Sequence, residues 1–120
     1  MAPKKILIIE DDKLIIKILD FVLKKEGYET FISNDGNDGI EKIGSIQPDL
    51  VITDVMMPYK SGLEITAYSK KNFPEIPVII VSALGKEDQT VIEGFKLGVD
   101  DFIAKPFNPI ELVLRVKRFF

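Results

Sequence analysis

Short apolar blocks alternate along the chain with longer segments in which apolar residues recur at helical spacing. Five of the blocks predict β-strands, at residues 5–9, 28–33, 50–53, 78–81 and 101–104. The first, third and fourth blocks are continuously apolar and rich in isoleucine and valine, which is typical of parallel strands covered on both faces. The second and fifth blocks hold more polar residues, so we expect them at or near the edges of the sheet.

The intervening segments predict five helices. Four are expected at residues 13–26, 35–45, 61–73 and 86–97, and the fifth begins at Asn108 and Pro109. The first has the clearest amphipathic period, with Ile15, Leu19 and Val22 on one face. The second is weaker because two glycines stand near its start. The (βα)5 order predicts an α/β fold, in which right-handed crossovers place helices on both faces of one sheet.

The composition narrows the chemistry that the chain can perform. With 120 residues, 46% of them hydrophobic, it can bury one sizeable core, so we expect a single domain over residues 1–120. Cysteine and histidine are both absent, which excludes disulfides, thiolate and imidazole metal sites and any triad with a histidine base. The net charge is −3, so no positive field favours a nucleic acid or an anionic membrane. Because the apolar runs are far shorter than the roughly 20 residues of a membrane span, we expect a cytoplasmic protein.

Polar side chains follow the predicted strands at the point where each one ends. They are Glu10, Asp11 and Asp12 after the first strand, Asp54 after the third, Ser82 after the fourth and Lys105 after the fifth. Ligands of such sheets bind outside the carboxyl ends of the strands. Because clustered carboxylates repel one another unless a proton or a hard cation neutralises them, the pattern predicts a divalent-cation site, with Mg²⁺ as the expected ion. Each acid on its own is equally consistent with a helix or turn cap, and Lys105 with an ordinary solvated lysine.

These segments resemble the receiver domains of bacterial two-component response regulators. The resemblance covers residues 5–119 and rests on four segments in chain order: Ile8-Ile9-Glu10-Asp11-Asp12, Asp49-Leu50-Val51-Ile52-Thr53-Asp54-Val55-Met56-Met57-Pro58 with Ser61-Gly62, Val81-Ser82-Ala83, and Gly98-Val99-Asp100-Asp101-Phe102-Ile103-Ala104-Lys105-Pro106-Phe107. It implies a flavodoxin-like, doubly wound parallel sheet in the order 2-1-3-4-5. It also implies a phosphoacceptor signalling switch, which receives a phosphoryl group from a sensor histidine kinase or a phosphotransfer protein and controls an output domain or partner protein. Such a domain assists only its own phosphorylation and dephosphorylation.

The resemblance also implies a role for each polar residue at the strand ends. Asp54 is the expected phosphoacceptor, and Lys105 and Ser82 are expected to contact oxygens of the phosphoryl group. The expected Mg²⁺ ligands are Glu10, Asp11, Asp54 and the backbone carbonyl of Met56. Since the apolar strand ends at Ile9, we expect Asp12 to begin the following helix instead of binding the ion.

Two further pairs of residues are expected to sense and shield the phosphoryl group. In the family, inward movement of the hydroxyl residue, here Ser82, frees space into which an aromatic, here Phe102, rotates. The alternative for Phe102 is a plain edge-strand aromatic. Met56 and Leu84 are expected to flank the phosphoryl group, and because both are apolar we expect its loss to take minutes or longer. The alternative is that both only cover the rim of the site.

The last helix carries apolar residues on both of its sides. Ile110 and Leu114 lie nearly opposite the residues expected to pack on the sheet. With Phe102 and Arg118 they form a candidate contact surface over the fourth helix, fifth strand and fifth helix, for a homodimer or for an output domain. Thr90 stands where family members with winged-helix output domains usually carry a basic residue, which argues against their specific dimer. Fraying near the chain end is the alternative for the apolar pair.

Three other functions fit parts of the pattern. A receiver-like interaction module that is never phosphorylated would be expected to lack some of the acids or the lysine, and none is missing. An aspartate-nucleophile phosphatase needs a second acid two residues after its nucleophile, where this chain has Met56. A flavodoxin-like mononucleotide-binding protein needs a small-residue phosphate loop, where Glu10, Asp11 and Asp12 would repel phosphate. We further expect either a receiver that acts alone or the N-terminal part of a longer response regulator.

Overall fold

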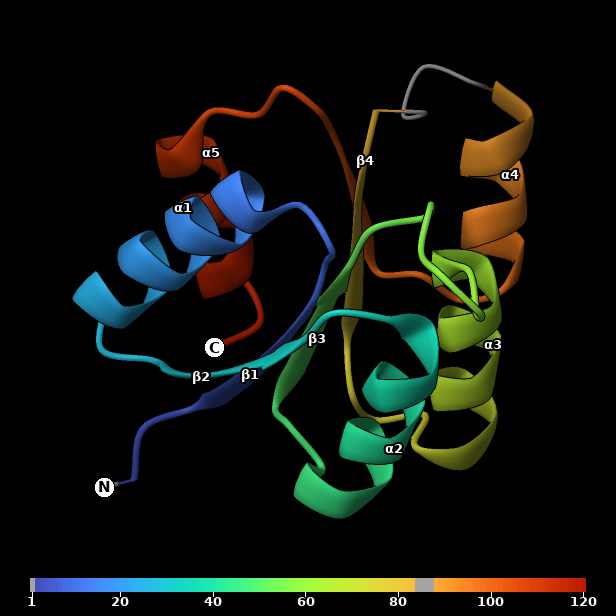
Figure 1. Cartoon of the computed structure of the whole chain (residues 1–120), viewed down its shortest axis with the longest axis horizontal. Helices are drawn as coiled ribbons and strands as arrows, with labels where there is room; N and C mark the ends of the chain where they lie inside the picture. The colour runs from blue at the N-terminus through green and yellow to red at the C-terminus, as the bar shows by residue number, and fades with distance from the viewer. Residues whose placement is uncertain (1, 84–87) are drawn as a thin grey trace.

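A computed structural model describes residues 2–83 and 88–120, and within them five strands alternate with five helices (Figure 1). In chain order the elements are β1 (Lys5–Ile9), α1 (Lys13–Lys25), β2 (Glu29–Ser33), α2 (Gly36–Ile46), β3 (Leu50–Thr53), α3 (Gly62–Asn72), β4 (Val78–Ser82), α4 (Asp88–Lys96), β5 (Asp101–Ala104) and α5 (Pro109–Lys117). The predicted (βα)5 order is therefore confirmed. No helix in these two ranges combines the length and the apolar character that crossing a membrane would require.

The five strands form one parallel sheet in the order β2-β1-β3-β4-β5. β1 pairs with both β2 and β3, and Ile9 lies opposite Ser33 on one side and Thr53 on the other. β4 joins β3 to β5, with Ile80 between Thr53 and Phe102. The order 2-1-3-4-5 implied by the resemblance is confirmed, and the more polar strands β2 and β5 lie at the two edges.

The sheet separates two apolar layers. α1 and α5 cover one face, and α2, α3 and α4 cover the other (Figure 1). Along β1, Ile6 and Ile8 face the α1–α5 layer and Leu7 and Ile9 face the α2–α4 layer, because successive side chains of a strand point to opposite faces. All four side chains are fully buried, which explains why the predicted central strands are continuously apolar.

Side-chain caps set the starts of the helices. The Asp12 carboxylate accepts hydrogen bonds from the first turn of α1, so Asp12 begins this helix, as predicted. Asp35 and Ser61 cap α2 and α3 in the same way, and Asn108 caps α5 ahead of Pro109. A capping residue has extended backbone, and for this reason α2 and α3 begin one residue later than the sequence predicted.

Glycines follow two of the helices, and the other differences from the predicted bounds are small. Gly27 after α1 and Gly98 after α4 have φ values of 93° and 98°, which residues with a side chain rarely adopt. β2 starts at Glu29, one residue later than predicted, and β4 extends one residue further, to Ser82. The start of α4 that was predicted at residue 86 lies outside the described residues.

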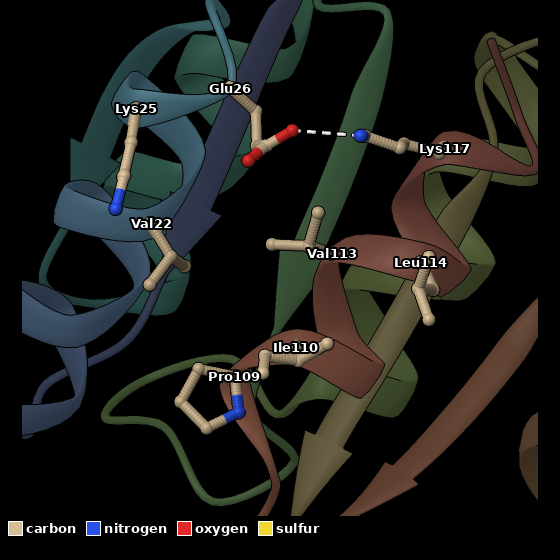
Figure 2. A pocket seen from close by; sticks show the side chains of 8 residues that line it. All are labelled: Val22, Lys25, Glu26, Pro109, Ile110, Val113, Leu114 and Lys117. Carbon is tan, nitrogen blue, oxygen red and sulfur yellow. Dashed lines mark ion pairs between the residues drawn. The ribbon is translucent and has the colours of Figure 1, made fainter.

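α1 and α5 pack against each other and leave a groove of about 290 Å³ between them (Figure 2). Its lining is apolar at Val22, Val113 and Leu114. Lys117 pairs with Glu26 across the groove at 2.8 Å, and this interaction raises the pKa of Lys117. Because solvent reaches both side chains, the pair adds little to stability.

Replacing Ser61 tests the capping box that begins α3. The Ser61 hydroxyl accepts the Glu64 N–H while the Glu64 carboxylate accepts the Ser61 N–H, both at 3.2 Å. Because loss of the hydroxyl leaves a backbone donor without its cap, we expect Ser61→Ala to lower the free energy of unfolding by about 1 kcal/mol in urea denaturation. Ser45→Ala is the matched control. Ser45 is exposed within α2, so alanine there should be neutral or slightly stabilising, and equal losses in the two variants would contradict the cap.

Candidate functional site

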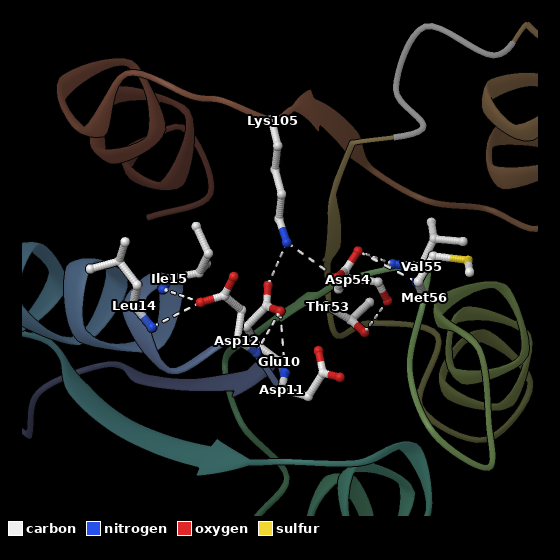
Figure 3. Close-up of polar contacts among 10 residues, drawn as sticks. All are labelled: Glu10, Asp11, Asp12, Leu14, Ile15, Thr53, Asp54, Val55, Met56 and Lys105. Atoms are coloured by element: carbon white, nitrogen blue, oxygen red, sulfur yellow. Dashed lines mark hydrogen bonds and ion pairs between the residues drawn. The ribbon is translucent and has the colours of Figure 1, made fainter.

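Three carboxylates meet at the ends of β1 and β3 (Figure 3). One oxygen from each of Glu10, Asp11 and Asp54 lies within 4.8 Å of the other two. The register of the strands brings them together, because Ile9 lies opposite Thr53 and the Asp54 N–H donates to the Ile9 carbonyl at 3.1 Å. The clustering predicted from the strand ends is therefore present in the structure.

Lys105 supplies the positive charge at this cluster. It extends from the segment after β5, and its Nζ lies 2.9 Å from Glu10 Oε1 and 3.1 Å from Asp54 Oδ2 (Figure 3). Glu10 is 2% exposed and Asp54 8%, so water does little to stabilise their charges. Burying an ionised carboxylate is costly unless a partner pairs with it. One lysine therefore compensates two buried acids, while Asp11 is exposed to solvent.

Backbone amides donate hydrogen bonds to the carboxylate oxygens that Lys105 does not contact. Glu10 Oε2 accepts the N–H groups of the next two residues, both at 3.2 Å. Asp54 Oδ1 accepts the N–H of Val55 at 2.7 Å and that of Met56 at 3.4 Å. Each buried carboxylate thus has one oxygen fixed by its own loop and the other turned toward Lys105. These charge-assisted bonds stabilise the negative charge of the two carboxylates and fix their orientation.

Burial and charge shift the pKa values of the buried groups. Burial raises the pKa of Glu10 and the Asp54 charge adds to the rise, although Lys105 and the Asp12 backbone oppose it. For Lys105, burial lowers the pKa, but the hydrogen bonds and charges of Glu10 and Asp54 outweigh burial and the pKa is raised. Lys105 is therefore cationic at neutral pH, whereas Glu10 holds its proton more tightly than an exposed glutamate.

The structure describes three of the other residues expected at or beside the site. Ser82 ends β4 and is buried, and its carbonyl accepts the Lys105 N–H at 3.0 Å. Met56 stands in the loop after β3 with its side chain largely exposed. The Asp12 carboxylate caps α1, which agrees with the expectation that Asp12 begins the helix. Leu84, expected to flank the site with Met56, lies outside the described residues.

The residues of the candidate contact surface lie in two places. Phe102 is half-buried in the α2–α4 layer, beside Gly94 of α4. Ile110, Leu114 and Arg118 follow one another at helical spacing along α5, and Ile110 is 71% and Leu114 59% exposed. Ile110 and Leu114 border the groove between α1 and α5 (Figure 2). The structure therefore brings the α5 residues together and leaves Phe102 on the opposite face of the sheet.

A charged cluster that the sequence did not indicate ties α5 to β5. Arg115 Nη1 lies 3.0 Å from both Asp101 oxygens, and Arg115 Nη2 lies 3.4 Å from Glu111. Arg118 Nη1 lies 3.9 Å from the same Asp101 carboxylate. The hydrogen bond and charge of Asp101 raise the pKa of Arg115. The Arg115–Glu111 pair lies within α5 at i,i+4 spacing. The contacts with Asp101 form only when α5 packs beside β5, so no local spacing signals them.

Known proteins with similar sequences and structures cover nearly the whole chain. The family model described as response regulator receiver domain matches residues 6–117. The BeF3-activated receiver domain of DrrB is 37% identical with a TM-score of 0.90, over 98% of this chain and 97% of that one. A CheY-like response regulator receiver domain protein from Methanospirillum hungatei is 29% identical with a TM-score of 0.93, over 98% and 93%. The response regulator DrrB, an OmpR/PhoB homologue of Thermotoga maritima, is 37% identical with a TM-score of 0.88, over 98% of this chain and 52% of that one.

Lys105→Met removes the positive charge that two buried carboxylates share. Without it the pKa of Glu10 should rise further, because Lys105 is one of the groups that now oppose the effect of burial. A raised carboxylate pKa means that the folded state holds a proton that the unfolded state releases. The free energy of unfolding therefore falls as the pH rises from the pKa of the unfolded state toward the raised pKa of the folded state. We expect the variant to lose about 2 kcal/mol of unfolding free energy at pH 8 and about 1 kcal/mol or less at pH 5. Urea denaturation in metal-free buffer at the two pH values measures the difference.

Lys24→Met is the matched control for this variant. Lys24 pairs with Asp20 at 3.1 Å, and the lysine side chain is mostly exposed on α1. An exposed pair within a helix contributes about 0.5 kcal/mol or less, so Lys24→Met should change stability little at either pH. A loss in Lys105→Met that is equal at pH 5 and pH 8 would contradict the charge balance described for Lys105.

Proposed function

The chain belongs to the response regulator receiver domain family and is a phosphoacceptor signalling switch of two-component systems, and from this premise we propose that Asp54 is its phosphoacceptor. The observation that carries the proposal is the contact of Asp54 Oδ2 with Lys105 at 3.1 Å, beside two further carboxylates. A carboxylate is a competent nucleophile for a phosphoryl group. Transfer of that group depends mainly on positioning and on compensation of negative charge, and the residues around Asp54 supply both.

The reaction that we propose is an in-line displacement at phosphorus. One oxygen of Asp54 forms the O–P bond of an acyl phosphate while the N–P bond of a partner's phosphohistidine breaks, and the electron pair stays on the imidazole nitrogen. The chain has no histidine of its own, which fits a phosphoryl group that arrives from another protein. Lys105 already bonds to Asp54, and we assign it the contact with a phosphoryl oxygen as negative charge accumulates there.

We propose that the ion at this site is Mg²⁺. The proposed ligands are Glu10, Asp11, Asp54 and the backbone carbonyl of Met56. The donor set supports this ion, because Mg²⁺ takes oxygen ligands and is commonly held by one or two carboxylates together with waters and phosphate oxygens. When bound, it neutralises negative charge on the oxygens of the transferred group. The exposed position of Asp11 leaves the cluster open to solvent on one side, where a phosphoryl group can enter.

We propose that Ser82 and Phe102 report the phosphoryl group to the surface of the domain. Ser82 ends β4 opposite Ala104 of β5, directly before Lys105. Phe102 lies on β5 two residues before Ala104, and its ring packs beside α4. When the Ser82 hydroxyl moves toward a phosphoryl oxygen, space opens between β4 and β5 and the Phe102 ring fills it. The change reaches the surface formed by α4, β5 and α5.

Membership of the family implies the kinds of partner. Receiver domains work with histidine kinases or phosphotransfer proteins and with output domains. We propose that the surface of α4, β5 and α5 contacts the output domain or partner protein, or a second copy of the chain. We further propose that residues 1–120 act in the cytoplasm as one domain that does not itself bind nucleic acid and assists only its own phosphorylation and dephosphorylation. Loss of the phosphoryl group over minutes stays a prediction.

Intact mass spectrometry after incubation with Mg²⁺ and acetyl phosphate tests the phosphoacceptor. The unsubstituted chain should gain the mass of one phosphoryl group, and Asp54→Asn should gain none, because an amide lacks the nucleophilic oxygen anion. Asp12→Asn is the matched control. Asparagine caps a helix about as well as aspartate, so this variant should react at the rate of the unsubstituted chain within about twofold. An adduct that persists in Asp54→Asn would falsify the assignment.

Calorimetric titration with Mg²⁺ distinguishes the two neighbouring acids. Asp11 contributes an oxygen to the carboxylate cluster, so Asp11→Asn should weaken Mg²⁺ binding by about tenfold or more. Asp12 uses its carboxylate to cap α1 at Leu14 and Ile15, so Asp12→Asn should change the affinity by no more than about twofold. If both variants weaken Mg²⁺ binding equally, the affinity depends on net charge and not on ligation. That result would contradict the proposal that Asp11 is a ligand.

A further inference from the structure

The first turn of α2 packs against the loop that joins β3 to α3. The Gly36 N–H donates to the Pro58 carbonyl in this loop at 3.0 Å. Gly36 is the first residue of α2 and is buried. It is also one of the two glycines that weakened the helical pattern of this segment in the sequence. The phosphoacceptor chemistry described above assigns no role to this contact.

Position 36 requires glycine because there is no room for a side chain, and not because of its backbone conformation. The glycines with positive φ in the described part of the chain are Gly27 and Gly98. A Cβ at Gly36 would collide with the Lys60 carbonyl oxygen and Cβ, and would lie 2.8 Å from the Lys60 carbonyl carbon. Protein interiors are packed too closely to absorb such an overlap, and a backbone atom cannot turn aside as a flexible side chain can. Any other residue at this position therefore pushes the loop away from α2.

The same loop sets the orientation of Asp54. Its Val55 and Met56 N–H groups donate to Asp54 Oδ1 at 2.7 and 3.4 Å. On the α3 side, the Gly62 N–H donates to the Val55 carbonyl at 2.9 Å. Between the anchors on α2 and α3, Tyr59 has a φ of 70°, a value that persists in a residue with a side chain only where its surroundings impose it. The course of the loop is thus imposed by α2 and α3 together.

We propose that Gly36 is a positioning residue for the Asp54 site. Its close approach to Pro58 and Lys60 keeps the loop amides on Asp54 Oδ1, and this leaves Oδ2 directed at Lys105 and the cation site. A side chain at position 36 displaces the loop, weakens the amide bonds and lets the Asp54 carboxylate rotate. The role of Asp54 as phosphoacceptor rests on the proposed function, whereas the effect on the loop amides and on Mg²⁺ binding does not.

Gly36→Ala tests this role with measurements that need no phosphoryl transfer. In two-dimensional NMR spectra the amide resonances of Val55 and Met56 should shift, because their hydrogen bonds to Asp54 Oδ1 lengthen. In calorimetric titration Mg²⁺ binding should weaken by about tenfold or more, the range found when residues that orient ligands are replaced. Formation of the beryllofluoride adduct should weaken in parallel.

Two variants of the same helix separate positioning from a general loss of stability. In Gly44→Ala the added methyl group meets the Tyr68 hydroxyl oxygen at 3.7 Å, an ordinary contact, so the loop amides and the Mg²⁺ affinity should not change. Ile43→Val removes a methyl group from a fully buried side chain and should lower the urea midpoint. Ile43 lies about two turns further along α2 than Gly36, so its variant should keep the Mg²⁺ affinity within about twofold.

Unchanged Mg²⁺ affinity in Gly36→Ala, or an equal weakening in Ile43→Val, would overturn the proposal. If Gly36→Ala does not fold, hydrogen exchange in the unsubstituted chain takes its place. Coupling between two sites is reciprocal, so Mg²⁺ should slow exchange of the Gly36 N–H, and exchange that is indifferent to Mg²⁺ would also overturn it. A different result would contradict only the phosphoacceptor role of Asp54. In that case the unsubstituted chain forms no phosphoryl adduct, while Gly36→Ala still weakens Mg²⁺ binding.

Discussion

Two buried carboxylates share one ammonium group, and the rest of the site depends on this shortage of positive charge. The pairing of β1 with β3 prevents Glu10 and Asp54 from moving apart, and Lys105 contacts both. A phosphoryl group adds further negative charge at this edge, and that charge favours binding of a cation or a new position of the lysine. A change of charge at Asp54 therefore changes the position or pairing of Lys105, and through Lys105 it affects Glu10. This coupling is the physical basis of a switch.

The carboxylate cluster could be predicted from the sequence because it follows a local rule. Residues that come directly after neighbouring parallel strands share one end of the sheet, and the apolar run that ends at Ile9 marks where this end begins. The same run distinguishes Glu10 and Asp11 from Asp12, which is far enough along the chain to cap α1. Strand order, by contrast, came from the resemblance, since alternation of strands and helices alone is compatible with several orders.

Contacts between distant elements could not be predicted, because they depend on how the helices pack. Gly36 meets the loop after β3 only because α2 and α3 cover the same face, and Arg115 meets Asp101 only because α5 lies beside β5. The period of a strand shows which side chains alternate, but not which helices cover each face. For this reason the sequence grouped Phe102 with residues of α5, although its ring belongs to the other layer.

The division into two layers lets the two sides of the domain change independently in evolution. Side chains under α1 and α5 come from strand positions that alternate with those under α2, α3 and α4, and the backbone of the sheet lies between them. Substitutions that share no neighbours have nearly additive effects on stability, so a change in the packing under α1 and α5 need not disturb the packing beside α4. The acidic edge, to which both layers are attached, has no such freedom. Side chains on either side can therefore be replaced while the carboxylate cluster at this edge keeps its geometry.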